Sequence, residues 1–344
     1  MSYRGLQVAL VVPCFNEEAT IANVLTDFRR AVAGIGLFVF DNNSTDRTAQ
    51  EAVGAGATIV SVKLQGKGNV VRRMFSDVEA DIYVMVDGDG TYHADSLPSL
   101  LDMLIDQRLD MVVGTRITPA ADVSDAFRSG HRWGNVMLTR MVAWLFGGQF
   151  SDMLSGYRVF SRRYAKSFPA LARGFETETE LTVHALELRM PCGEVPTPYG
   201  ARPMGSVSKL STYRDGFKIL RAITRLFITE RPFAFFGSWG VGLGAISIAL
   251  AFPVLAEFTR TGLVPRFPTA VLSACLMICA LTAFMSGLIL EKVTLSRQEF
   301  KRLAYLGIPA LVPHSIGAPV GSRPTGIAPS HLAAAPTPVL REAA

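Results

Sequence analysis

The chain has 344 residues, of which 49% are hydrophobic and 18% are charged, and its formal net charge is +5 at pH 7. One α/β domain fits within this length, but the apolar share exceeds what such a domain needs, which argues against an ordinary soluble protein. The four cysteines are too scattered for a zinc site or a disulfide framework: Cys14, Cys192, Cys275 and Cys279.

Five apolar runs rich in β-branched residues are separated by segments long enough to form helices. The runs are Leu6–Val12, Leu37–Phe40, Thr58–Val62, Ile82–Val86 and Met111–Val113. Strands that alternate with helices predict a βαβ arrangement. Because the runs are almost wholly apolar, we expect the strands to be covered on both faces. The predicted fold class is therefore α/β.

Polar residues follow several of these strands. The first strand leads into Asn16-Glu17-Glu18 and lacks the glycine-rich turn of a dinucleotide-binding enzyme, which disfavours hydride transfer. Asp41 ends the second strand, and Asp87-Gly88-Asp89 follows the fourth. The carboxyl ends of strands form the ligand-binding edge of an open α/β sheet. Two carboxylates there, with a glycine between them, predict a site for Mg²⁺ or Mn²⁺ and a diphosphate.

Taken in order, these segments resemble the signature of family 2 glycosyltransferases. The resemblance extends from about Leu6 to Lys209, and its later half is typical of the polyprenyl-phosphate branch, the dolichol-phosphate mannose synthase group. The matching segments are Val12–Glu18, Asp41–Asp46, Gly66–Gly68, Asp87–Asp89, Gly114–Arg116, Asp152–Arg158 and Arg202–Lys209.

The resemblance implies a GT-A fold, with a Rossmann-like mixed sheet, and a role for each group of matched residues. The catalytic residues would be Asp89 and Asp152, and the metal ligands Asp89 and Asp87. Donor binding would use Pro13, Phe15, Glu17, Asp41, Asn42, Lys67, Asp87, Gly88 and Asp89. The acceptor phosphate would be bound by Arg116, Arg128, Arg132, Arg202, Ser206 and Lys209. Thr91 stands where the family often has Gln, which leaves a second protein ligand to the metal open.

The activity implied is inverting transfer of a hexose from a UDP- or GDP-sugar to undecaprenyl or dolichyl phosphate. A phosphate monoester has a second pKa of about 6, so the acceptor is largely ionised near neutral pH and needs little help from a base. Asp152 is the base usually proposed in related enzymes. An orienting role for Asp152 is equally open. The acidic segment Glu176–Glu180 is interpreted as stabilising the start of the helix after it.

Two charge-free stretches, Pro232–Ala256 and Phe267–Leu290, are each about as long as the 20 residues that a membrane-spanning helix needs. Basic residues flank the pair on both sides, which predicts a hairpin with both ends in the cytoplasm. The predicted segments are a catalytic domain over 1–212, a basic amphipathic helix over 213–231, spans over 232–257 and 267–290, an extracytoplasmic loop over 258–266, a cytoplasmic helix over 291–306, and a disordered tail over 307–344.

These features predict an enzyme of the cytoplasmic (inner) membrane, whose first residues run straight into a strand with no secretory signal. Its predicted partners are the nucleotide-sugar, the polyprenyl phosphate and the lipid bilayer, and the spans allow a homo-oligomer. Because the basic residues crowd the membrane-proximal segment, lipid headgroups are favoured over nucleic acid.

Three alternatives stay open at this point. A processive polysaccharide synthase is disfavoured because the one Arg-Trp pair, Arg132-Trp133, precedes Asp152 and has Ser129 where Gln is expected. A sugar-nucleotide pyrophosphorylase is disfavoured because Asn16-Glu17-Glu18 replaces its glycine-rich loop. A non-catalytic membrane scaffold that retains the nucleotide fold is disfavoured by the intact aspartates.

Overall fold

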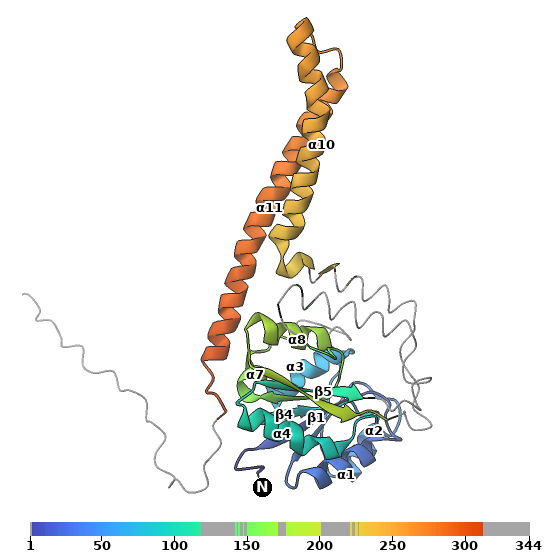
Figure 1. Ribbon diagram of the computed structural model, residues 1–344. Helices are drawn as coiled ribbons and strands as arrows, with labels where there is room; N and C mark the ends of the chain where they lie inside the picture. Colours follow the sequence, from blue (N-terminus) through green and yellow to red (C-terminus); the bar gives the residue numbers. More distant parts are fainter. Residues whose placement is uncertain are drawn as a thin grey trace, which may run out of the picture.

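The computed structural model describes residues 2–117, 142, 144, 147, 150–170, 177–200, 221, 224–225 and 227–311. In this part of the chain, a domain built on one sheet carries a long helical hairpin (Figure 1). The second helix of the hairpin returns to the side of the domain near α7.

The sheet has seven strands in the order β3-β2-β1-β4-β6-β5-β7. The strands are β1 Val8–Cys14, β2 Gly36–Asp41, β3 Thr58–Ser61, β4 Ile82–Met85, β5 Met111–Ile117, β6 Arg158–Ser161 and β7 Cys192–Pro198. β6 is antiparallel to both of its neighbours, β4 and β5, whereas the other adjacent strands pair in parallel. All five predicted strands are confirmed, and the predicted mixed sheet is as well.

Two strands were not predicted from the sequence. β6 begins with Arg158, whose charged side chain hides the apolar character of a strand that is buried throughout. β7 contains Pro196 and Pro198, which cannot donate a ladder hydrogen bond. Among the described residues β7 is the last strand of the sheet and pairs with β5, so these prolines are tolerated there.

Helices cover both faces of the sheet. They are α1 Ile21–Ala31, α2 Thr48–Gly54, α3 Lys67–Asp77, the 3₁₀ turn η1 Ala94–Ser96, α4 Leu97–Asp106, α7 Arg162–Ser167 and α8 Thr177–Glu187. Leu10 and Val12 of β1 join the apolar cluster that includes α1 and α4, whereas Ala9 and Val11 join the cluster that includes α3, α7 and α8. Successive strand residues point to opposite faces, so a strand covered on both faces must be apolar throughout.

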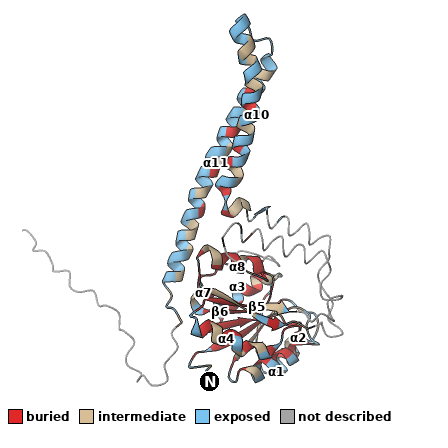
Figure 2. Ribbon diagram, in the orientation of Figure 1, coloured by how far each residue is buried: buried red, intermediate tan, exposed pale blue. Residues whose placement is uncertain are grey.

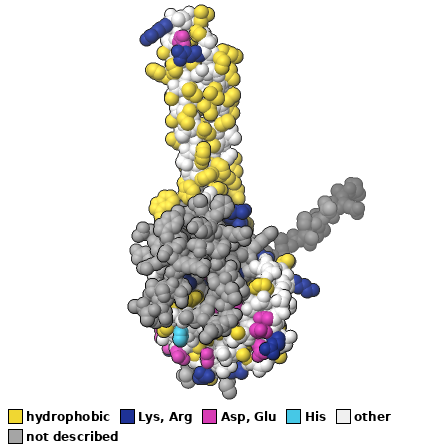
Figure 3. All heavy atoms as spheres, turned by 90° about the vertical axis from the view of Figure 1, so that its right-hand side faces the viewer, with side chains coloured by type: hydrophobic (Ala, Val, Ile, Leu, Met, Phe, Trp, Pro, Cys, Tyr) yellow, Lys and Arg dark blue, Asp and Glu magenta, His cyan; other side chains and the backbone are white. Residues whose placement is uncertain are grey.

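The hairpin consists of α10 Pro232–Thr261 and α11 Phe267–Leu306, and both helices are long and apolar enough to cross a membrane. Large side chains such as Trp239, Phe252 and Ile278 stand exposed along them. Figure 2 shows the mostly exposed surface of the hairpin, and Figure 3 shows that hydrophobic side chains cover it. Such a surface suits the hydrocarbon core of a bilayer.

Small residues form the seam between the two helices. On α11 the buried residues recur every seventh position, at Ser273, Ala280, Gly287 and Thr294. Facing them, Gly240 is so close that a Cβ there would lie 3.0 Å from the Ala280 carbonyl oxygen. The hydroxyl of Ser247 donates to the Ser273 carbonyl oxygen at 2.7 Å. A seven-residue period of small residues lets two helix backbones pack closely along their length.

The helix ends differ somewhat from the sequence prediction. α10 continues to Thr261, past the predicted end at residue 257, and stops at Gly262, whose φ of 67° ends the helix. α11 runs without a break through residue 290 to Leu306. The predicted amphipathic helix over 213–231 lies mostly outside the described residues, as does the tail beyond Leu311.

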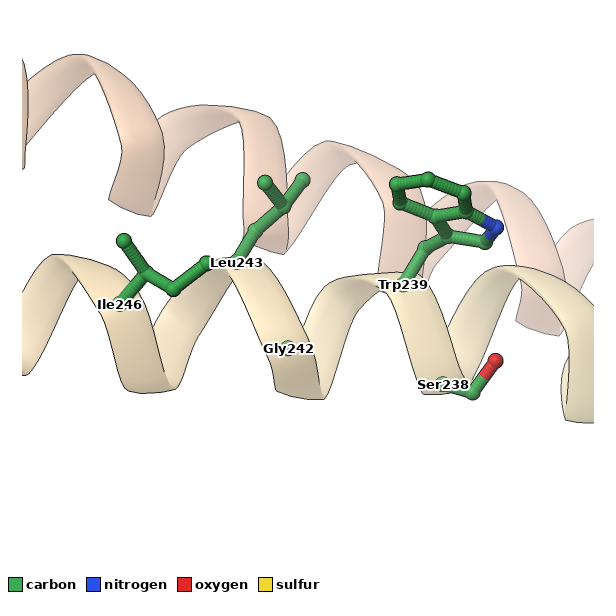
Figure 4. A pocket seen from close by; sticks show the side chains of 5 residues that line it. All are labelled: Ser238, Trp239, Gly242, Leu243 and Ile246. Atoms are coloured by element: carbon green, nitrogen blue, oxygen red, sulfur yellow. The ribbon is translucent and has the colours of Figure 1, made fainter.

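A hollow of about 240 Å³ lies on α10 (Figure 4). It is lined by Ser238, Trp239, Gly242, Leu243 and Ile246. A Cβ at Gly242 would meet nothing within 4 Å, so this face of α10 does not pack against the described residues of the chain. The hollow belongs to the hairpin and not to the sheet edge that carries the carboxylates.

Candidate active site

A buried ammonium group joins two carboxylates at the carboxyl edge of the sheet. Lys67, the first residue of α3, has its Nζ 2.5 Å from Asp87 Oδ1 and 2.5 Å from Glu178 Oε1. Asp87 follows β4, and Glu178 lies in the first turn of α8. Burial alone would lower the pKa of Lys67, but the charges of the two carboxylates outweigh burial and raise this pKa above its ordinary value. Lys67 is therefore positively charged.

Two glycines, Gly88 and Gly156, allow the Asp87–Asp89 segment to pack closely against its neighbours. A Cβ on Gly156 would overlap the carboxylate of Asp87. A Cβ on Gly88 would lie 2.8 Å from Cys14 Sγ and 3.6 Å from Glu17 Cγ. The segment after β4 thus packs directly against the segment after β1, as the sequence predicts for strand ends that share one edge.

Asp89 is buried, and Thr91 holds its carboxylate. The hydroxyl of Thr91 donates to Asp89 Oδ1 at 2.6 Å, and the backbone N–H of Thr91 lies 3.2 Å from the same oxygen. Thr91 itself is 1% exposed. At the position where the family often has Gln, this chain therefore uses a hydroxyl to orient the neighbouring aspartate.

The loops after β1 and β2 hold each other in place. The Ser44 hydroxyl accepts from the Asn16 backbone N–H at 2.9 Å, and Asn16 Oδ1 accepts from the Thr45 N–H at 2.8 Å. The Glu17 N–H donates to Thr48 Oγ1 at 2.8 Å. These contacts fix the loop on which Phe15 and Glu17 lie, directly after Pro13 and Cys14 at the end of β1 and beside the carboxyl end of β2 at Asp41.

Asn42 uses its side-chain amide within the protein. Its Nδ2 donates to the carbonyl oxygens of Val62 and Leu64, each at 2.9 Å, and its Oδ1 accepts from the Gly66 N–H at 2.7 Å. Asn42 therefore fixes the loop that leads to Lys67. The resemblance implies donor binding for Asn42, and that role stays a prediction.

Arg116 and Asp152 form a bidentate ion pair. Arg116, near the carboxyl end of β5, donates from Nε to Asp152 Oδ2 and from Nη2 to Oδ1, both at 2.7 Å. Its guanidinium lies 5.5 Å from the centre of the Tyr199 ring. Burial would raise the pKa of Asp152, but the hydrogen bonds and charge of Arg116 outweigh burial and lower it. Asp152 is thus ionised and weakly basic.

Arg158 is fully buried and supports the loop that carries Asp152. Its guanidinium donates to the carbonyl oxygens of Met153 and Ser155 and, at 2.9 Å, to the hydroxyl of Thr182 on α8. Arg158 therefore connects the loop of Asp152 to α8, the helix whose first turn contains Glu178. The matched segment contained Arg158, but these contacts could not be predicted from the sequence.

The described residues therefore bring Lys67, Asp87 and Asp89 together with the loops after β1 and β2, and they place Arg116 and Asp152 at the end of β5 on the same sheet. Five predicted acceptor-site residues lie outside the described part of the chain: Arg128, Arg132, Arg202, Ser206 and Lys209. Sequence reasoning missed the roles of Thr91, Gly156, Arg158 and Glu178. For Glu178, the run of alternating acids was a signal, but it was interpreted as helix stabilisation.

Comparisons with known proteins identify the family of this chain. The family described as "Glycosyl transferase family 2" matches residues 9–168. The glycosyltransferase AglJ of Haloferax volcanii is 34% identical over 302 residues, which cover 87% of this chain and 98% of that protein. The chain therefore belongs to glycosyl transferase family 2, and it is a glycosyltransferase. The dolichyl-phosphate hexose transferase of Haloferax volcanii is 30% identical over 224 residues, or 65% of this chain and 95% of that protein.

A solved structure supports the GT-A fold. Glucosyl-3-phosphoglycerate synthase from Mycobacterium tuberculosis, in complex with Mn²⁺, uridine diphosphate and phosphoglyceric acid, has a TM-score of 0.51 and 26% identity. The match covers 65% of this chain and 78% of that one. The same enzyme has also been solved with Mg²⁺ and uridine diphosphate.

Proposed function

We propose that this glycosyltransferase moves a hexose from a UDP- or GDP-sugar to a polyprenyl phosphate at the cytoplasmic face of the membrane. The observation that carries the proposal is the α10–α11 hairpin, which is apolar enough to cross a membrane and belongs to the same chain as a family 2 site. A catalytic domain tied to the bilayer suits an acceptor that is itself a lipid. The similarity to a dolichyl-phosphate hexose transferase supports the same acceptor class.

The donor would bind where the loops after β1, β2 and β4 meet. The nucleoside would lie along Pro13–Glu17 and Asp41, and the sugar and diphosphate beside Asp87 and Asp89. The uridine diphosphate held by the solved glucosyl-3-phosphoglycerate synthase supports a nucleotide in this fold. Lys67 neutralises Asp87 and so lowers the repulsion between that carboxylate and an anionic donor.

The residues present fit one divalent metal, Mg²⁺ or Mn²⁺. Asp89 offers hard oxygen atoms and is held in place by Thr91, whereas Asp87 Oδ1 is already bonded to Lys67. The described residues contain no group of three or more His, Cys, Asp or Glu side chains placed to hold a metal ion by themselves. We therefore assign the metal mainly to Asp89, with the diphosphate and water as its other ligands. When bound, the metal would stabilise the negative charge on the departing nucleoside diphosphate.

The reaction would be a single displacement. An oxygen of the acceptor phosphate forms a bond to the anomeric carbon while the bond from that carbon to the diphosphate oxygen breaks and its electron pair leaves with the nucleoside diphosphate. The sugar carbon is inverted. Arg116 would attract the acceptor phosphate, and Asp152 would hold the guanidinium of Arg116 in a fixed orientation. Both residues would thus contribute to catalysis by positioning the acceptor.

The test is a transfer assay with the purified full-length chain in lipid nanodiscs that contain undecaprenyl phosphate. Radiolabelled UDP- and GDP-hexoses are supplied one at a time, with Mg²⁺, Mn²⁺ or EDTA, and lipid-extractable label is counted. We expect metal-dependent label from at least one donor and none with Asp89→Ala. Transfer to 3-phosphoglycerate but not to the lipid would show that the acceptor is a water-soluble phosphate and would contradict the proposed lipid acceptor. Folded protein that labels no lipid with any donor would refute the proposal.

A further inference from the structure

Two elements of the catalytic domain each connect the active site to the end of α11. Asp110 immediately precedes β5, and Arg116 lies near the other end of that strand. Glu187 ends α8, and Glu178 lies in its first turn. Asp110 and Glu187 both contact α11, whereas Arg116 and Glu178 both belong to the candidate active site.

The contacts with α11 are polar and specific. Lys301 Nζ lies 2.5 Å from Glu187 Oε2, and the Tyr305 hydroxyl donates to Asp110 Oδ2 at 2.8 Å. Arg163 also donates to Asp110, and its guanidinium lies 4.7 Å from the centre of the Tyr305 ring. We call these five residues the docking contact. Figure 1 shows the end of α11 beside α7, on the flank of the domain.

Burial makes the docking contact hard to open. The carboxylates of Glu187 and Asp110 are each 1% exposed, and the Lys301 side chain is 14% exposed. A buried carboxylate that loses its partner is strongly disfavoured, because neither water nor another charge replaces the lost interaction. The docking contact therefore holds the end of α11 firmly against the domain.

α11 also sets how far the docking contact lies from the apolar part of the hairpin. The Phe233 N–H at the start of α10 lies 3.4 Å from Glu291 Oε2, so Glu291 marks the level at which the apolar part of the hairpin ends. Between Glu291 and Tyr305 the helix is unbroken, which corresponds to about 21 Å at 1.5 Å per residue. Arg297 pairs with Glu230 at 2.6 Å and joins the segment before α10 to the same helix.

We propose that Lys301 and Tyr305 are positioning residues for transfer to a membrane-embedded acceptor. Through the docking contact they hold β5 and α8, and with them Arg116 and the Lys67–Glu178 pair, at a set depth below the bilayer surface. The proposal rests on the proposed function, since it concerns how the site reaches a lipid phosphate. Neither residue takes part in the chemistry, because the docking contact lies at the opposite ends of β5 and α8.

The positioning role predicts different effects on transfer to two kinds of acceptor. A polyprenyl phosphate in a bilayer keeps its phosphate at a fixed depth, so it reacts well only when the site is held at that depth. A short-chain, water-soluble isoprenyl phosphate can diffuse to the site wherever the domain lies. Loss of the docking contact should therefore impair transfer to the first acceptor and spare transfer to the second.

The experiment uses the full-length chain in nanodiscs, with undecaprenyl phosphate or citronellyl phosphate as acceptor. The variants are Tyr305→Phe, Lys301→Met and the two combined, with the neighbouring exposed Arg302→Met as the matched control and Lys301→Arg as the conservative substitution. We expect the double variant to lose about tenfold or more in kcat/KM for undecaprenyl phosphate, with less than about twofold change for citronellyl phosphate. Arg302→Met and Lys301→Arg should match the unmodified chain.

The thermal unfolding of each variant is measured, so that a loss of activity through misplacement of the site is distinguished from a loss of stability. If the double variant fails to fold, Tyr305→Phe still tests the proposal, because it removes only one hydroxyl. Equal losses with both acceptors, or no loss with either, would overturn the positioning role. If the unmodified chain transfers sugar to citronellyl phosphate but not to the lipid, or to neither acceptor, the proposed function itself fails. The two failures are therefore distinguishable.

Discussion

Arg116 donates to both carboxylate oxygens of Asp152, from Nε and from Nη2, and both distances are 2.7 Å. A general base must accept a proton, yet this carboxylate is bonded on both oxygens to a permanently charged group. The pair explains why the pKa of Asp152 is lowered in spite of burial. It favours an orienting role for Asp152 over that of a base.

The first prediction concerns pH. Because the pKa of Asp152 is lowered in the folded state, the stability it contributes is present above the unfolded pKa of about 3.9 and is lost as pH falls through the lower folded value. Asp152 therefore stays ionised across pH 5 to 9. We expect the acid limb of kcat/KM to follow the acceptor phosphate, with an apparent pKa of about 6.

The variant Asp152→Asn tests this interpretation directly. It should lower the rate through poorer orientation of Arg116, while the acid limb stays near pH 6 in a plot of kcat/KM against pH. A limb that disappears in Asp152→Asn would show that the carboxylate itself takes the proton. Circular dichroism at each pH confirms that the variant is folded.

The second prediction concerns Thr91. Thr91→Val removes the hydroxyl that donates to Asp89 Oδ1 at 2.6 Å but keeps the shape of the side chain. We expect the metal concentration for half-maximal activity to rise about tenfold, because a buried hydrogen bond to a charged group contributes about 1.5–3 kcal/mol. Thr91→Ser keeps the hydroxyl and should behave like the unmodified chain. An unchanged metal requirement in Thr91→Val would contradict a role for Thr91 in holding a metal ligand.

The third prediction concerns Lys67. Lys67→Met leaves the carboxylates of Asp87 and Glu178 without the ammonium that they share, and loss of one partner from a buried ion pair costs about 3–5 kcal/mol. We expect a clear drop in melting temperature and a higher KM for the donor. Glu178→Gln keeps Lys67 beside Asp87 and should cost about 1–2 kcal/mol. Equal and small effects of the two substitutions would show that this charge cluster matters little.

Much of this architecture was predictable because its physical causes are local. Strands β1 to β5 are short, mostly apolar runs. Asp41 ends β2, and Asp87 and Asp89 lie in the loop after β4, so topology alone places these carboxylates at one edge. The two apolar stretches were equally visible, since the length of a spanning helix is set by the bilayer.

The rest depends on contacts between residues far apart in the sequence. Glu178 looked like an acid that stabilises the start of a helix, and only folding brings it to Lys67. Arg158 made the buried strand β6 hard to recognise, because a charged residue is not expected in a buried strand. In the folded protein its guanidinium donates to carbonyl oxygens and to the hydroxyl of Thr182. Tyr305 and Asp110 are 195 residues apart, and no periodicity in either segment signals that they meet.

The fourth prediction concerns the seam of the hairpin. Gly240→Ile would place a side chain against the backbone of α11, because even a Cβ there would lie 3.0 Å from the Ala280 carbonyl oxygen. Gly242→Ile, two residues along the same helix, adds the same side chain where a Cβ would meet no atom of the described residues within 4 Å. Close packing of small residues holds membrane helices together, so only the first change should force α10 and α11 apart.

We expect Gly240→Ile to lower the melting temperature of the protein in nanodiscs and to reduce transfer to undecaprenyl phosphate, with Gly242→Ile close to the unmodified chain. Cross-linking between cysteines introduced at Ser247 and Ser273, which share a hydrogen bond, measures the separation of the helices. Cross-linking that persists in Gly240→Ile would mean that the pair tolerates the added volume. If Gly242→Ile were instead the damaging change, this result would indicate that another segment or a second copy of the chain packs against the hollow lined by Trp239 and Ile246.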